Sequence, residues 1–464
     1  MDWLPWTAET FARAARESKP ILLSISAAWC RACHEMDRTT YADPTVQALA
    51  AERYIAIRVD TDHRPDINDR YNLGGWPTTA FLTPEGALIG GGTYLEADRM
   101  AGVLRQVADA FPALARRPSP LRMRGPHLQT READPRTRAT EETVFATFDE
   151  EFGGFGTEPK FPLTAPLRLA MALFRERSDP RHQLIVERTL DAIAGGGLQD
   201  REAGGYYRYA ITRDWQLPHR EKLLDTNARL LAVFVESAST FGRAIDRERV
   251  ERLASFVVSL ASPAGGYRAS AEDTRVFAAS TSHAAAALLA AAELLDDGEL
   301  ARSTLTRFEA FLLPAYRPGA GIAHYVEDDG RLAGLLADQV AAGNALLTAY
   351  AVTGDEPYRM MAEEIGHYVL RELAAPDGGF FDRVGDPSDV GLLRTPRVPF
   401  VENCEAAVFF AALTRASREA AFDGVAGRAL DRAAPEAAAY GPDAAHWLLG
   451  QRSKAKIEGK DLKI

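Results

Sequence analysis

Apolar residues recur with two different periods along the chain, and the change comes near residue 140. The first part contains short apolar runs with the period of two that is typical of strands, separated by stretches with the 3.6-residue period of amphipathic helices. The predicted strands lie at 21–26, 54–60, 78–83 and 87–90, and the predicted helices at 7–18, 33–41, from Pro44, 65–71 and 96–111. The first part is therefore predicted to be a small α/β domain.

From about residue 141 the chain repeats one pattern, helix after helix rich in Ala, Leu, Arg and Glu. Segments with a 3.6-residue period lie at 165–176, 183–194, 224–240, 247–262, 281–295, 300–313, 338–352, 358–373 and 404–421. A glycine-aromatic element stands between alternate helices, at 152–156, 204–209, 265–270, 321–325 and 378–383. Its spacing of roughly 50 to 60 residues is the length of one helical hairpin with its loops, which indicates a structural repeat.

Helical hairpins of this kind stack into an open solenoid or close into a ring. Five glycine-aromatic loops, with a last hairpin near 433–447, indicate six hairpins and hence an all-α (α/α)6 toroid. Aromatic loops at one end of such a ring would line a pocket suited to stacking on sugar rings. The alternative is structural: paired glycines supply positive φ after a helix, and the aromatic residue fills the core.

Two cysteines in the first part, Cys30 and Cys33, follow the first predicted strand and begin a helix. A C-x-x-C pair at a helix N-terminus favours a thiolate, and after a strand it indicates a thioredoxin-like redox motif. C-x-x-C-H, completed by His34, is also the haem c attachment signature, but attachment requires export and the sequence has no signal peptide. A zinc half-site is the other alternative, and the third cysteine, Cys404, lies far away with no paired neighbour.

The order of the elements in the first part, with Trp76-Pro77 directly before a strand, is that of the thioredoxin fold. In that fold the proline faces the disulfide in the cis form, where its missing N–H leaves room beside the sulfurs. Trp76-Pro77 is therefore predicted to be cis. An ordinary trans proline that opens an edge strand is the alternative.

Composition and charge narrow the function classes. The chain has 464 residues, enough for two or three domains, and its net charge of −11 argues against nucleic acid or an anionic membrane surface as the main partner. Three cysteines are too few for a secreted disulfide scaffold, and no stretch approaches the roughly 20 apolar residues of a membrane span. The protein is expected to be soluble and cytoplasmic, with no metal or other cofactor.

Four segments are expected along the chain: a thioredoxin-like domain at 1–112, a linker or strap at 113–140, the toroid at 141–450 and a basic, frayed tail at 451–464. The linker prediction rests on four prolines, seven arginines and the loss of apolar periodicity between 113 and 140. The tail prediction rests on the basic composition of the last residues.

Six motifs together resemble a known family. They are W-C-R-A-C-H-E-M, R-V-D-T-D-H-R-P-D-I-N, G-G-W-P-T-T-A-F-L-T-P-E-G, G-G-G-T-Y, G-T-E-P-K-F-P and P-H-R-E-K-L-L-D-T-N-A-R-L-L, and they span about residues 3 to 230. The sequence resembles the DUF255 proteins of the spermatogenesis-associated protein 20 type, which implies a thioredoxin-like domain followed by a six-hairpin glycosidase-like domain. It departs from them at Arg31 and Arg220, where histidine and phenylalanine are usual, and at 271–274, where an acidic run is reduced and a long following segment is missing. A shortened, divergent branch is expected.

The predicted redox chemistry assigns different roles to the two cysteines. Cys30 is the expected attacking thiol because it is nearer the helix start, and Cys33 is expected to resolve the mixed disulfide. Arg31 and His34 are expected to lower the thiolate pKa. The predicted catalytic residues are Trp29, Cys30, Arg31, Cys33, His34 and Pro77.

One feature of thioredoxins is missing from this redox motif. Thioredoxins usually carry a buried Asp six residues before the first cysteine, and here Ser24 takes that place. Proton transfer then needs another group. Asp60, Asp62 and His63 follow the second predicted strand and are candidates for it.

The helical part offers candidates for a pocket but no defined pair. Glu221, Asp225 and Ala228 fall on one face of an apolar helix and can point into a toroid, whereas charges at a solvated helix start are the alternative. A glycosidase needs two carboxylates about 5 to 10 Å apart, and an epimerase or isomerase more typically uses histidines. The candidates are Tyr207, His219, Glu221, Lys222, Asp225, Glu272, Asp273, His324, Asp382 and Glu402.

Three functions follow as hypotheses. The first is a dithiol–disulfide oxidoreductase, with a protein thiol client or reductant as partner, fused to a toroid with a sugar-like or other small ligand. The second is a carbohydrate-active enzyme, a hydrolase or epimerase, whose thioredoxin-like domain is structural or redox-sensing. The third is a binding protein without catalytic activity.

Overall fold

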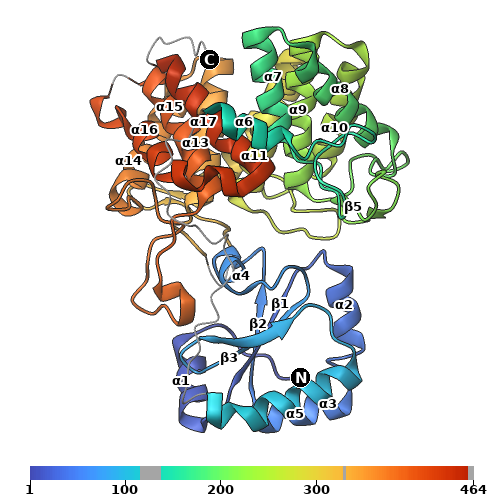
Figure 1. Cartoon of the computed structure of the whole chain (residues 1–464). Helices are drawn as coiled ribbons and strands as arrows, with labels where there is room; N and C mark the ends of the chain where they lie inside the picture. Colours follow the sequence, from blue (N-terminus) through green and yellow to red (C-terminus); the bar gives the residue numbers. More distant parts are fainter. Residues whose placement is uncertain (115–136, 328–330, 418, 458–464) are drawn as a thin grey trace. The chain divides into compact units, whose positions relative to one another are not determined.

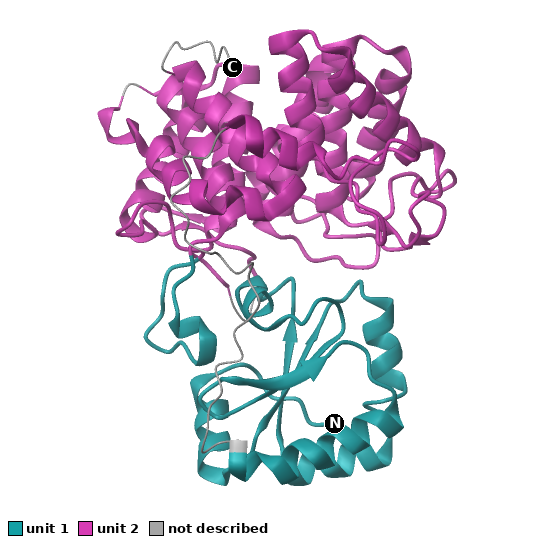
Figure 2. Cartoon of the chain, viewed as in Figure 1, with its two compact units in different colours: residues 1–127, 383–397 teal, residues 128–382, 398–464 magenta. Residues whose placement is uncertain are grey.

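The computed structural model describes residues 1–114, 137–327, 331–417 and 419–457. The chain divides into two compact units, each with its own core (Figures 1 and 2). Unit 1 comprises Met1–His127 and Arg383–Arg397, and unit 2 comprises Leu128–Asp382 and Val398–Ile464. Most of the linker predicted at 113–140 lies outside the described residues.

Unit 1 has the thioredoxin order of elements that its sequence pattern predicts. Its strands are β1 (Ile21–Ser26), β2 (Ile55–Asp60), β3 (Thr78–Leu82) and β4 (Leu88–Gly92), in the spatial order β2-β1-β3-β4. Strand β1 pairs parallel with β2 and antiparallel with β3, and β3 pairs antiparallel with β4. The helices are α1 (Ala8–Glu17), α2 (Arg31–Arg38), α3 (Pro44–Arg53), α4 (Pro65–Tyr71) and α5 (Ala97–Leu114).

Both faces of this sheet are covered, which explains why β1 is apolar along most of its length. Ile21, Leu23 and Ile25 of β1 belong to one buried cluster, and Leu22 belongs to the cluster on the other face. Central strands that are buried on both faces carry nearly continuous apolar runs. The C-terminal end of β1 is thereby fixed, and the redox motif follows it directly.

A distant segment, Arg383–Arg397, is part of unit 1 (Figure 2). Val390 and Leu393 of this segment join the buried cluster of Trp6 and Tyr71. Tyr71 Oη accepts a hydrogen bond of 2.7 Å from the N–H of Leu392 and donates one of 2.8 Å to Gly86 O. The sequence pattern did not separate this segment from the helical part, since it lies between two stretches of the helical repeat.

Unit 2 is the predicted (α/α)6 ring. Its inner helices are α7 (Ala165–Arg177), α9 (Leu224–Phe241), α11 (Ala278–Leu295), α13 (Leu336–Thr353), α15 (Phe400–Ala416) and α17 (Ala445–Ile457). Its outer helices are α6 (Thr137–Phe145), α8 (Pro180–Gly195), α10 (Ala244–Ser259), α12 (Gly298–Ala315), α14 (Glu356–Glu372) and α16 (Val425–Ala433). Each inner helix packs against the next and α17 packs against α7, so the ring is closed.

The glycine-aromatic loops of unit 2 are hydrogen-bonded to the inner helices that follow them. In four cases the fourth residue of the inner helix bonds both the N–H and the C=O of the residue after the glycine; these fourth residues are Asn227, Thr281, Gln339 and Asn403. Asn227, for example, accepts from Tyr206 N at 2.7 Å and donates to Tyr206 O at 3.0 Å. Tyr206, Tyr267 and Phe380 are buried, so their aromatic rings fill the core and do not line a sugar pocket. The structural interpretation is confirmed at these positions.

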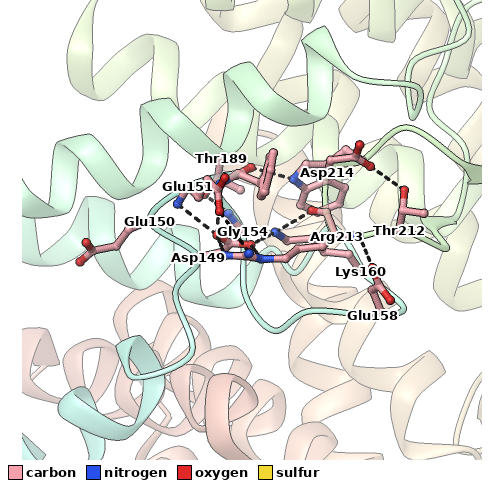
Figure 3. A network of polar contacts seen from close by, with 12 residues as sticks. Asp149, Glu150, Glu151, Gly154, Glu158, Lys160, Thr189, Thr212, Arg213 and Asp214 are labelled. Atoms are coloured by element: carbon pink, nitrogen blue, oxygen red, sulfur yellow. Dashed lines mark hydrogen bonds and ion pairs between the residues drawn. The ribbon is translucent and has the colours of Figure 1, made fainter.

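The motif G-T-E-P-K-F-P has a structural role in a polar network around Asp149 (Figure 3). Lys160 is fully buried and donates to Asp149 Oδ2 at 2.6 Å and to Arg213 O at 3.0 Å. Arg213 donates to both carboxylate oxygens of Asp149, at 2.8 and 2.9 Å. Burial opposes ionisation of Asp149, but the hydrogen bonds from Arg213 and Lys160 outweigh it and hold the pKa of this carboxyl well below its usual range. The network thus keeps Asp149 ionised as one side of a buried ion pair.

The tail predicted at 451–464 is partly helical. Helix α17 continues to Ile457, and its buried Arg452 pairs with Glu141 at 2.8 Å and Glu176 at 3.0 Å, so the first half of the predicted tail is ordered helix. The remainder, 458–464, lies outside the described residues.

Among the described helices, α11 alone has the length and composition of a membrane span, with a mean hydropathy of 1.2. Its place in the inner ring, between α9 and α13, accounts for that composition.

Candidate functional site

The redox motif sits at the start of α2, where β1 delivers it. Cys30 is the N-cap residue of α2, and its Sγ accepts a hydrogen bond of 3.1 Å from the N–H of Cys33. The two cysteines form a disulfide with their Cα atoms 5.2 Å apart. A helix N-terminus stabilises negative charge, so reduction of this disulfide would leave a thiolate at Cys30 in a favourable position.

Trp29 directly precedes the first cysteine and contacts a second tryptophan, Trp76. Trp29 packs edge to face against Trp76, with ring centroids 5.6 Å apart, and the Trp76-Pro77 bond is cis, as predicted. The indole N–H of Trp29 donates to Asp62 Oδ2 at 2.6 Å. The indole N–H of Trp76 donates to Asn68 of α4 at 3.2 Å. Residues that follow β2 therefore hold the aromatic rings beside the disulfide.

The acidic residues that follow β2 have different surroundings. Asp60 Oδ1 accepts hydrogen bonds from the backbone N–H groups of Asp62 and His63, at 2.9 and 3.1 Å, and so stabilises the turn. Asp62 holds Trp29. Arg31 and His34 are exposed on the first turn of α2. Asp62 is thus in direct contact with the motif through the indole of Trp29.

Hydroxyl groups occupy the region of β1 where thioredoxins carry a carboxylate. Ser24 pairs with Thr79 of β3 in the sheet register, and Tyr41 Oη lies 3.0 Å from Thr79 Oγ1. Burial raises the pKa of Tyr41 above its ordinary value of 10.0, which keeps the phenol protonated. The cluster supplies hydrogen bonds but no carboxylate.

Most of the candidates predicted in unit 2 belong to separate local contacts. His219 Nδ1 is hydrogen-bonded to Glu221, and Lys222 pairs with Asp200 at 2.8 Å. Tyr207 Oη also donates to Asp200, at 3.1 Å.

The candidates on the later loops have other partners. Asp273 pairs with Arg275 at 2.6 Å, and Ser270 donates to Glu272 at 3.1 Å. His324 is buried and bonded to Asp338 at 3.0 Å. Asp382 accepts at its backbone oxygen from the N–H of Leu336, and Glu402 lies in the first turn of α15.

Asp225 is the predicted residue that lines a cavity of unit 2. The cavity has a volume of about 360 Å³, and its lining includes Phe161, Arg208, Asp225, Arg229, Glu405, Asp443 and His446. An ion-paired core crosses the ring at this cavity: Arg229 of α9 donates to Asp225 Oδ2 and to Glu405 Oε1 of α15, each at 3.0 Å. His283 Nδ1 of α11 lies 2.7 Å from Asp225 Oδ1.

Both carboxyls of this ion-paired core stay ionised at neutral pH. Burial disfavours the charged form of Glu405, but the positive charge of Arg229 outweighs it and lowers the pKa of Glu405 to about 2. The same balance, with Arg229 and His283 as partners, lowers the pKa of Asp225. Burial lowers the pKa of His446, so its imidazole is neutral at pH 7. Burial raises the pKa of Asp443 above its ordinary value of 3.8.

A stack of three rings on the loops of unit 2 begins at this cavity. Phe161, 38% exposed and part of the lining, stacks on Tyr209 with ring centroids 4.7 Å apart. Tyr209 in turn stacks on His219 at 4.8 Å. The cavity thus combines an aromatic face with carboxylate, guanidinium and imidazole groups, the usual composition of a site for a polar small molecule.

Sequence reasoning missed most of this cavity. Arg229 and Glu405 are 176 positions apart, and only closure of the ring brings them together. One signal was available: Arg229, His283 and Glu405 are titratable residues within inner helices that are rich in Ala, Leu and Phe. A charge on a helix that is apolar all round is costly unless it is paired. Among the described residues, no group of three His, Cys, Asp or Glu side chains is placed to hold a metal ion.

Known proteins resemble the two units separately. Residues 1–116 match the family model described as "Protein of unknown function, DUF255". The chain is 40% identical over 79 residues to thiol:disulfide interchange protein DsbD 1 of Pseudomonas aeruginosa, which covers 16% of this chain and 13% of that protein. Unit 1 is thus a thioredoxin-like, DsbD-related domain.

Longer matches join the two units. The chain is 30% identical over 266 residues to an uncharacterized protein of Caenorhabditis elegans, covering 50% of this chain and 36% of that one. It is 28% identical over 306 residues to spermatogenesis-associated protein 20 of Mus musculus, covering 59% of this chain and 38% of that one. The chain therefore spans less than two fifths of the length of these relatives.

Solved structures match unit 2 in fold. Cellobiose 2-epimerase of Bacillus thermoamylovorans superimposes with a TM-score of 0.55 at 12% identity, covering 64% of this chain and 86% of that one. An unsaturated glucuronyl hydrolase specific for heparin gives 0.54 at 12%, covering 71% and 98%. At these identities the likeness shows the fold alone. The chain thus joins a thioredoxin-like domain that matches the DUF255 model to a helical domain with the six-hairpin glycosidase-like fold, and it is similar to spermatogenesis-associated protein 20 over 59% of its length.

Proposed function

We propose that unit 1 is a dithiol–disulfide oxidoreductase that exchanges its Cys30–Cys33 disulfide with thiols of a protein client or reductant. The observation that carries the proposal is the position of Cys30 as N-cap of α2, where its sulfur accepts the N–H of Cys33. This geometry favours Cys30 as the thiolate that attacks a client disulfide and Cys33 as the group that releases the client. The contact of Trp29 with Trp76 and the cis Trp76-Pro77 bond, both expected for a thioredoxin-like redox site, support the proposal.

Trapping of the mixed disulfide tests these roles. Cys33→Ser should accumulate a covalent complex through Cys30 when a model disulfide-bonded protein is added, because no second thiol releases the client. Cys30→Ser should accumulate none under the same conditions. Non-reducing mass spectrometry reads the complex, and Cys404→Ser, at the buried third cysteine, is the matched control that should behave as wild type. Equal trapping by both single variants would contradict the assignment.

As a second function, for unit 2, we propose that its cavity binds a neutral saccharide. The observation in favour is the exposed face of Phe161 in a cavity that also presents Asp225, Arg229 and Glu405. An aromatic face stacks on the apolar face of a sugar ring, while carboxylates and guanidinium groups bond its hydroxyls. Because the positive charges of Arg229 and Arg208 balance the negative charges of Asp225 and Glu405 in the lining, the cavity suits a neutral ligand better than a strongly charged one.

Calorimetry with cellobiose as the probe tests this second function. Phe161→Ala should weaken binding at least 10-fold through loss of the stacking face. Tyr94→Ala is the matched control, since Tyr94 is also 38% exposed but lies in unit 1 and should leave binding unchanged. Absence of binding to the wild-type protein across a panel of neutral mono- and disaccharides would overturn the proposal.

A further inference from the structure

The titratable groups of the unit 2 cavity fall into two classes. Asp225, Arg229 and Glu405 are committed to one another by the hydrogen bonds of the ion-paired core. Asp443 and His446 also line the cavity, but their side chains make no hydrogen bond within the described part of the chain. The nearest ionic contact of His446 is Glu405, whose Oε1 lies 3.7 Å from His446 Nδ1. These two groups remain available to a ligand.

The backbone places Asp443 and His446 on the same wall. The 3-10 segment η3 (Ala434–Ala444) is broken at Gly441, with φ of +53°, and α17 begins at Ala445. Pro442 follows the break and Asp443 follows the proline. Asp443 and His446 are three positions apart across the start of α17, and residues at this spacing share one helix face. Asp443, near the end of η3, and His446, in the first turn of α17, therefore line the cavity together, while the ion-paired core lines it from α9 and α15.

Burial moves the pKa values of these two groups toward each other. Burial raises the pKa of Asp443, and the positive charge that His446 can carry opposes this. Burial lowers the pKa of His446; Glu405 of α15 and Asp443 oppose this, while Arg229 of α9 and Arg168 of α7 add to it. Titratable groups whose pKa values are altered by burial and by charged neighbours, and which line a cavity, mark a candidate functional site.

We propose that Asp443 and His446 are an acid–base pair that opens and closes the ring of a reducing saccharide bound in the cavity. The inference rests on the proposed saccharide binding and adds a reaction to it. The pair acts in the form that carries one proton between the two residues. The Asp225–Arg229–Glu405 core positions the ligand and His446.

The atoms of this reaction balance without a co-reactant. One residue donates its proton to the ring oxygen while the other removes the proton of the anomeric hydroxyl; the bond between the anomeric carbon and the ring oxygen breaks, and a carbonyl forms. Ring closure on either face of the carbonyl returns both protons and gives either anomer. The net reaction is interconversion of the α and β anomers, a general acid–base reaction.

NMR exchange between the anomers of cellobiose tests the proposal on the full chain. The wild-type protein should accelerate interconversion over the protein-free buffer, and Asp443→Asn and His446→Gln should each lower that acceleration at least 10-fold. Binding of cellobiose, measured by calorimetry, should change less than 3-fold in these variants. Asp431→Asn, an exposed Asp on α16, is the charge-matched control and should keep the wild-type rate.

The pH profile separates an acid–base role from a structural one. Below both pKa values the pair has no base, and above both it has no acid, so the rate should be bell-shaped. Its maximum should lie between 3.8 and 6.5, the ordinary pKa values of the two residues, because burial moves both inward. Asp443→Asn should remove the acidic limb. Binding of cellobiose without acceleration, or variants with wild-type rates, would overturn the proton-transfer proposal alone, whereas absence of saccharide binding would overturn both proposals.

Discussion

The two candidate sites of this chain are encoded in opposite ways. In unit 1 the cysteines lie three positions apart at one helix start, and Trp29, Arg31 and His34 are their neighbours in the sequence. In unit 2 the ion-paired core joins α9 and α15 across 176 positions, and it exists only because the ring is closed. A local site is visible as a motif in a single sequence. A site assembled by ring closure has no motif, and its residues look like isolated charges on apolar helices.

This difference predicts where each site is vulnerable. Substitutions in the polar networks of unit 2 should act mainly through stability, because the ring must close before the cavity exists. Substitutions next to Cys30 should act mainly through reactivity.

The largest effect is expected at the fully buried Lys160. Lys160→Met leaves Asp149 with one cationic partner fewer in the Figure 3 network, and breaking a buried ion pair in this way costs about 3–5 kcal/mol. Urea unfolding followed by fluorescence would measure the loss. Lys19→Met removes the more exposed pair with Glu17 and should leave stability unchanged. A Lys160→Met protein as stable as wild type would show that the network is not structural.

The ion-paired core should make stability depend on pH. The pKa of Glu405 is about 2 in the folded chain, against an ordinary value of 4.5, so its contribution is complete above pH 4.5 and is lost as the pH falls toward 2. That contribution is about 3 kcal/mol at neutral pH. Glu405→Gln should therefore be less stable than wild type at pH 7, and the difference should shrink toward pH 3. A difference that does not change with pH would contradict the assigned ion pair.

The smallest of these effects concerns the distant segment Arg383–Arg397, which we expect to stabilise unit 1. Gly391, in the distant segment of unit 1, has φ of +61°, and an added Cβ would lie 2.4 Å from Tyr71 Oη. Gly391→Ala should destabilise unit 1 by about 1–3 kcal/mol through strain and overlap. Gly90→Ala in β4, where an added Cβ meets nothing within 4 Å, is the control. Equal stability of the two variants, measured by urea unfolding, would mean that the segment does not support unit 1.

The sequence was informative wherever neighbours along the chain decide the structure. The strand and helix order of unit 1, the cis Trp76-Pro77 bond and the ring of hairpins all follow from local periodicity and short motifs. The docking of Arg383–Arg397 on unit 1 could not be predicted, because nothing in its composition specifies contacts with Tyr71. The glycine loops were ambiguous for a similar reason. The residues that hydrogen-bond these loops, such as Asn227 and Asn403, are polar residues in the first turn of an inner helix. This pattern becomes visible only when the repeats are aligned on the helix starts.

The proposed oxidoreductase function depends on reversible oxidation of Cys30 and Cys33, and a redox titration measures this reaction. The protein would be equilibrated in glutathione or dithiothreitol buffers, trapped with a thiol reagent and read by mass spectrometry, with Cys30→Ser as the control. The account predicts a reversible two-electron transition of Cys30 and Cys33 between roughly −120 and −270 mV, the range of working oxidoreductases. Cysteines that resist reduction and reaction until the protein unfolds would contradict the account and leave the cavity of unit 2 as the remaining candidate site.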